Sequence, residues 1–120
     1  MCDRALRYMA VEMLKDNRIL LLYANRDKDY VQDAVNEYFH GISIVTLHDM
    51  YTRYHVLVKN MHAYNTAWYS VVDLIDKTDE NDKEATKCYL DRLNEIRELH
   101  NQTQKEQRAI VNDLVKLIKS

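Results

Sequence analysis

A length of 120 residues is enough for one domain, and 47% hydrophobic with 30% charged residues excludes disordered and membrane-spanning chains. A formal charge of −2 argues against proteins that bind nucleic acid through a concentrated positive field. One glycine and no proline leave few positions for turns, so long helices are predicted.

The first 47 residues predict two helices and two strands in alternation. Residues 3–15 and 31–39 carry apolar side chains at the three- and four-residue spacing of an amphipathic helix. Residues 19–24 form a short continuous apolar run, and residues 42–47 are rich in the β-branched side chains that favour strands. We therefore predict a βαβ-like segment with parallel strands. The alternative is an all-α helical bundle.

Gly41 is the only glycine in the chain and follows the second predicted helix. Helices commonly end with a glycine in the left-handed conformation, because glycine has no Cβ to clash there. We therefore expect a positive φ at Gly41.

Residues 48–120 predict a long antiparallel helical hairpin within a single domain of residues 1–120. One helix carries an apolar seam in steps of four and three: Met50, Tyr54, Leu57, Met61, Tyr64, Trp68, Val71, Ile75. The last helix, expected over about residues 82–119, has a second seam: Tyr89, Leu93, Ile96, His100, Thr103, Gln107, Ile110, Leu114, Leu117. The connection between them, residues 76–82, is short and polar, which indicates a hairpin. Trp68 is expected to be buried in this seam.

Two features of the predicted hairpin indicate a protein interface. Residues 100–107 contain no large apolar side chain, so they need either water or a partner's polar side chains. Beside the first seam runs a flank with almost no charge, formed by Tyr51, His55, Val58, His62 and Tyr69. An exposed patch of this kind usually marks an interface, and a symmetric dimer is the commonest way to cover it. We therefore predict a homodimer with these five residues in its interface.

No constellation of residues predicts catalysis, a cofactor or a metal ion. His48, His55 and His62 recur every seven residues, which is about 10.5 Å along a helix and too far apart for one metal. Cys88 lacks an electropositive setting, so we expect a small packed residue rather than a nucleophile. One glycine cannot build a phosphate-binding loop of the type G-x-x-x-x-G-K-[ST].

The sequence thus predicts a non-enzymatic protein-binding module without cofactors: a small regulator, inhibitor or assembly factor, of the kind common among viral and phage accessory proteins. Two cysteines suggest a reducing compartment, hence the cytoplasm, and no apolar run or signal-peptide core predicts a membrane association. Besides a second copy, an unidentified protein partner is expected, and nucleic acid is not. The alternative is a nucleotide- or nucleic-acid-binding protein. In that reading Arg26 and Lys28 hold phosphate at the turn after the first strand.

Overall fold

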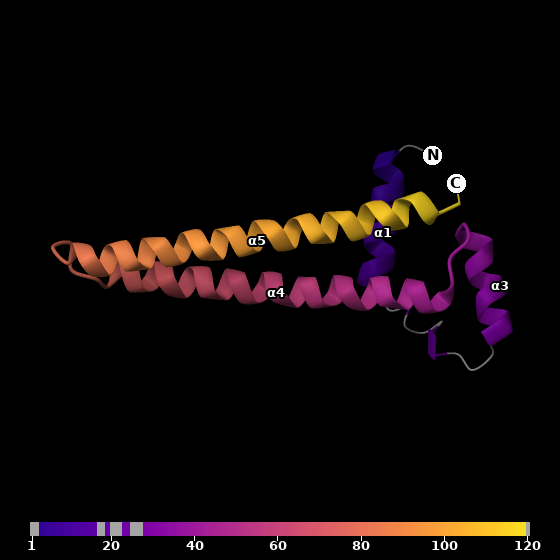
Figure 1. Ribbon diagram of the computed structural model, residues 1–120, viewed down its shortest axis with the longest axis horizontal. Coiled ribbons are helices and arrows are strands. Elements are labelled where there is room, and N and C mark those ends of the chain that lie inside the picture. Colours follow the sequence, from indigo (N-terminus) through magenta and orange to yellow (C-terminus); the bar gives the residue numbers. More distant parts are fainter. Residues whose placement is uncertain (1–2, 17–18, 20–22, 25–27, 120) are drawn as a thin grey trace. The chain divides into compact units, whose positions relative to one another are not determined.

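A computed structural model describes residues 3–16, 19, 23–24 and 28–119 (Figure 1). These residues contain four helices: α1 (Asp3–Lys15), α3 (Lys28–Tyr38), α4 (Ile44–Asp76) and α5 (Lys83–Leu117). The chain divides into two compact units: unit 1, residues 1–56 with 107–120, and unit 2, residues 57–106. The predominantly helical class is confirmed. The single domain over residues 1–120 stays a prediction.

The two predicted N-terminal strands are not seen in the described residues. Ile19, Tyr23 and Ala24 are helical, and residues 20–22 of that predicted strand lie outside the described residues. The second predicted strand, residues 42–47, is wrong because α4 already begins at Ile44.

An N-cap at Ser43 explains why the β-branched residues that follow it begin a helix. Its Oγ accepts a hydrogen bond from the backbone N–H of Thr46 at 3.1 Å, which is the geometry of a helix N-cap. The cap satisfies a backbone donor that the first helical turn leaves free. Ile44, directly after the cap, and Leu47, four positions after it, are buried at 6% and 0% exposure. Capping and burial together outweigh a β-propensity that spans only about 1 kcal/mol.

Unit 1 holds most of the buried apolar side chains. Of the sixteen that are buried among the described residues, fifteen belong to this unit. Leu14 in α1, Leu47 in α4 and Leu114 in α5 are each 0% exposed. Burial also raises the pKa of the Tyr54 hydroxyl. The amphipathic spacing predicted for residues 3–15 and 31–39 thus places α1 and α3 against a shared core.

The C-terminal end of the chain is held to the end of α3 by backbone pairing. Phe39 and Ile118 form an antiparallel bridge, and both side chains are buried. Next to the bridge, the backbone N–H of Lys119 donates to the carbonyl of Tyr38 at 2.9 Å. Segments far apart in the sequence therefore close the core of unit 1.

The predicted positive φ at Gly41 is confirmed, with φ at 56°. A Cβ added there would meet no atom within 4 Å, so only the backbone conformation opposes a larger residue. We expect Gly41→Ala to lower the free energy of unfolding by about 1–2 kcal/mol, the cost of a left-handed conformation for an L-residue. Urea titration followed by circular dichroism measures this change. Gly41→Asn is the matched control and should cost less, because asparagine tolerates the left-handed region; equal stability of all three proteins would contradict the assignment.

Unit 2 is an antiparallel pair formed by the remaining parts of α4 and α5 (Figure 1). The carboxylate of Asp82 accepts from the N–H of Ala85 at 3.1 Å and so caps α5. The polar stretch of residues 100–107 continues the helix without a break, and Thr103 within it is only 5% exposed. The predicted seams are confirmed, since none of their residues in unit 2 is exposed. Yet only Ile96 and Thr103 are buried there, so two helices alone leave the seam half covered.

Candidate functional site

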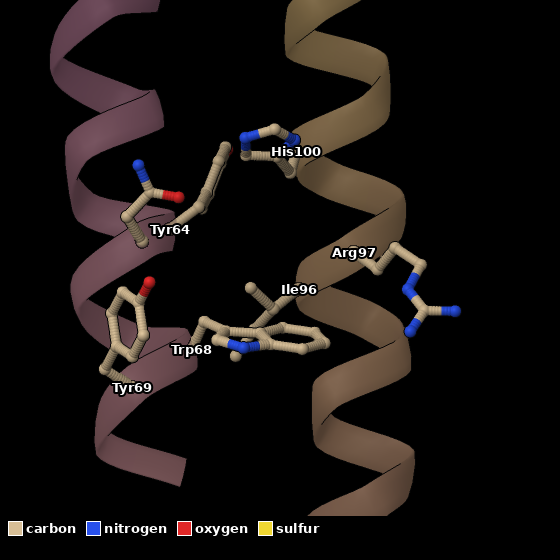
Figure 2. Close-up of a pocket in the computed structure, with 7 residues that line it drawn as sticks. Tyr64, Trp68, Tyr69, Ile96, Arg97 and His100 are labelled. Atoms are coloured by element: carbon tan, nitrogen blue, oxygen red, sulfur yellow. The ribbon is translucent and has the colours of Figure 1, made fainter. Parts of the chain in front are cut away.

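A surface pocket opens between α4 and α5 in unit 2 (Figure 2). Its volume is about 320 Å³. The lining residues come from both helices: Tyr64, Asn65, Trp68 and Tyr69 from α4, and Ile96, Arg97 and His100 from α5. We call this set the aromatic pocket. Antiparallel packing creates it, because seam residues form its floor while their neighbours one position further along each helix form its rim.

The aromatic side chains of the pocket differ in how far they are covered. Trp68 is half-buried, so the expected full burial is not reached. Tyr64 is also half-buried, whereas Tyr69 is 69% exposed. The central carbon of the Arg97 guanidinium lies 5.7 Å from the centroid of the Trp68 ring. Such a cation–π contact is worth about 0.5–1 kcal/mol at an exposed site, so it positions the arginine beside the pocket without neutralising it.

The charge at the aromatic pocket is positive. None of its lining residues is a carboxylate, and Arg97 makes no ion pair with any residue that the structure describes. The helical neighbours of Arg97 three and four positions away are Leu93, Asn94, His100 and Asn101, none of which is acidic. An unpaired guanidinium with five donors is suited to a carboxylate supplied from elsewhere.

Two of the five predicted interface residues are engaged within unit 1. The Nε2 atom of His55 lies 2.6 Å from the carbonyl oxygen of Leu14, which is a hydrogen bond. The rings of Tyr51 and His55 are in contact, with centroids 4.2 Å apart. One helical step earlier, His48 stacks on Tyr23 with centroids 3.8 Å apart. The N-terminal part of the chain therefore covers this end of the predicted flank.

The other three predicted interface residues belong to unit 2. Val58 is half-buried, and His62 and Tyr69 are exposed. With Asn65 they follow one another at steps of four, three and four, which places them on one face of α4. Of the three predicted residues, Tyr69 lines the aromatic pocket, as does Asn65 beside it, whereas Val58 and His62 do not.

The predicted phosphate site has no strand end to support it among the described residues. Arg26 lies outside those residues, and Lys28 is the first residue of α3. The prediction was based on a ligand at the carboxyl end of a strand, but the described residues of that segment are helical. Phosphate binding stays a prediction without a structural argument.

Sequence reasoning named Tyr64, Trp68, Ile96 and His100 as seam residues but missed Arg97 as a site residue. The sequence did contain an indication of an unpaired Arg97. This residue directly follows a seam residue, and no acidic residue lies three or four positions from it. Cys88 was expected to be packed; the structure shows it exposed with a free thiol.

No group of three or more metal-ligating side chains is present in the described ranges. In the same ranges, no helix combines the length and the apolar character needed to cross a membrane. No protein-family model, curated protein or solved structure matches the chain.

Proposed function

We propose that this protein is a non-enzymatic protein-binding module, a small regulator, inhibitor or assembly factor that binds through the aromatic pocket of its hairpin. The observation that supports this best is the exposure of Tyr69, at 69%, beside the half-buried rings of Tyr64 and Trp68. Tyrosine, tryptophan and arginine dominate the binding energy of protein interfaces, because they combine a large rigid contact area with a polar tip. All three types meet in this pocket.

The surroundings of the pocket also favour a protein partner. Along α4, residues 57–72 contain a single charged side chain, Lys59. Lys59 lies on the outer face of α4, so a partner that binds over the pocket desolvates no charged side chain of this segment, and charged groups are the costly ones to desolvate. Depletion of charge with enrichment of aromatic residues is typical of the core of an interface. The amide of Asn65 and the Tyr69 hydroxyl supply hydrogen-bonding groups at its edge.

Site-specific photo-crosslinking tests this proposal directly. A photoreactive phenylalanine analogue in place of Tyr69 should yield protein-sized adducts in cells that express the full chain. The matched control is the same analogue at Ser70, the exposed neighbour that lies about 100° further around α4. We expect adducts from position 69 and few or none from position 70. Equal yields at both positions, or no adduct at either, would contradict a protein-binding role for the pocket.

A further inference from the structure

A continuous surface extends from the aromatic pocket toward the tip of the hairpin. Tyr69, Val72 and Asp76 follow one another on α4 at steps of three and four, so they share one face. Arg97, Leu93 and Leu90 do the same on α5 in the opposite chain direction. Since Tyr69 and Arg97 line the same pocket, both rows lie on the same side of the antiparallel pair. We call these six residues the docking face.

The centre of the docking face is apolar and only partly covered. Tyr69 is 69% and Leu90 is 49% exposed, and Val72 and Leu93 are half-buried between them. Two helices cannot bury these side chains by themselves, because all but Leu93 lie beside the seam rather than in it. A contiguous exposed apolar surface of this kind marks an interaction site.

The two charges of the docking face lie at its opposite ends. Arg97 is beside the aromatic pocket, and Asp76 is the last residue of α4, about 10 Å further along the helix axis than Tyr69. Both are exposed, and neither has an ion-pair partner within the described part of the chain. Among its six residues, the docking face therefore has an apolar centre with one cation at one end and one anion at the other.

The docking face of one copy is complementary to that of a second copy rotated by 180°, because the rotation brings the Arg97 end of one copy to the Asp76 end of the other. A two-fold axis near Val72 and Leu93 exchanges the two ends of the face while it pairs the apolar centres, as an isologous interface requires. We infer that the occupant of the docking face is a second copy of the chain, docked so that Arg97 of each protomer pairs with Asp76 of the other. This inference rests on the proposed function and names its partner.

The opposite side of the hairpin lacks this complementarity. There Glu95 already pairs with Arg92 at 2.8 Å, and a second hollow is lined by Glu95 and Glu98 beside Leu99. Two copies joined through that side would bring carboxylates together, which disfavours association. The charge pattern therefore favours association through the docking face over association through the opposite side of the hairpin.

Charge reversal with sedimentation equilibrium tests the inference. We expect a concentration-dependent dimer for the unmodified chain. Arg97→Glu or Asp76→Lys alone places like charges at both ends of the interface and should weaken dimerisation about tenfold or more. The double variant Arg97→Glu/Asp76→Lys restores opposite charges and should recover most of the lost affinity. Lys59→Glu is the control for Arg97→Glu: it makes the same charge change at an exposed position on the outer face of α4, and should leave dimerisation unchanged.

Circular dichroism of each variant checks that the helices are retained. A chain that stays at 14.3 kDa at all concentrations would overturn the second copy as occupant. In that case adducts of another mass at position 69 would still support a protein-binding function. A dimer whose affinity does not respond to the single reversals, or is not recovered in the double variant, would overturn the Arg97–Asp76 pairing.

Discussion

Replacing Leu114 by alanine is expected to lower the free energy of unfolding of unit 1 by about 3–5 kcal/mol. The side chain is 0% exposed, so the substitution removes apolar contacts and leaves a cavity that the packed surroundings fill only in part. Domains of this size have a total stability of about 5–15 kcal/mol, so the loss is a large fraction of it. Urea titration followed by circular dichroism measures the change.

Leu99→Ala is the matched control for this substitution. It makes the same chemical change in the same helix, but Leu99 is 45% exposed and lies in unit 2. Helix propensity changes equally in both variants, so the difference between them isolates burial. We expect a cost within about 1 kcal/mol for Leu99→Ala. Similar costs for the two variants would show that α5 is not packed into the core of unit 1 at Leu114.

Replacing Trp68 by alanine is expected to destabilise unit 2 by about 2–3 kcal/mol, less than the 3–5 kcal/mol typical of a buried tryptophan. The cost is smaller because the side chain is only half-buried. Part of it comes from the lost contact between the Trp68 ring and the Arg97 guanidinium. Thermal unfolding followed by circular dichroism is the measurement, because the variant has no tryptophan left to report. Ser70→Ala, an exposed change on the same helix, should alter stability by no more than about 0.5 kcal/mol. The measurement is made on dilute protein, in which the docking faces are separated; a loss of the full core value there would mean that Trp68 is buried within a single copy.

The long helices could be predicted from the sequence because their apolar repeat extends over many turns. A seam in steps of three and four over residues 50–75 has no reasonable reading except a helix, and the structure leaves none of those seam residues exposed. The same applies to residues 89–117. Short segments give a weaker signal. Residues 42–47 contain too few positions to show a periodicity, so the strand was predicted there from the β-branched side chains alone.

That judgement failed because the deciding interaction lies just outside the apolar part of the run. The Oγ of Ser43 caps α4, and the helix then continues into the predicted hairpin without a break. A serine followed by isoleucine and valine is compatible with a strand or a capped helix, and only the burial of Ile44 and Leu47 in the core of unit 1 decides between them.

Only part of the candidate site could be predicted from the sequence, for a similar reason. Helical spacing placed Val58, His62 and Tyr69 on one face, as the structure has them. Spacing within one helix could not show that His55 donates a hydrogen bond to the carbonyl of Leu14, since that contact joins segments 41 residues apart. Nor could it show that Arg97 lies over Trp68, because the register between two helices depends on how their seams interlock.

The emission spectrum of Trp68 during dilution tests most directly whether the hairpin surface around the aromatic pocket binds a second copy. The chain has one tryptophan, and it lies in that pocket, so its environment reports on the surface without a label. We expect emission at shorter wavelength in concentrated protein and a shift to longer wavelength on dilution, as the docking faces separate and water reaches the ring. An emission maximum that stays constant while sedimentation shows the dimer dissociating would contradict this, because the two copies would then associate through another surface.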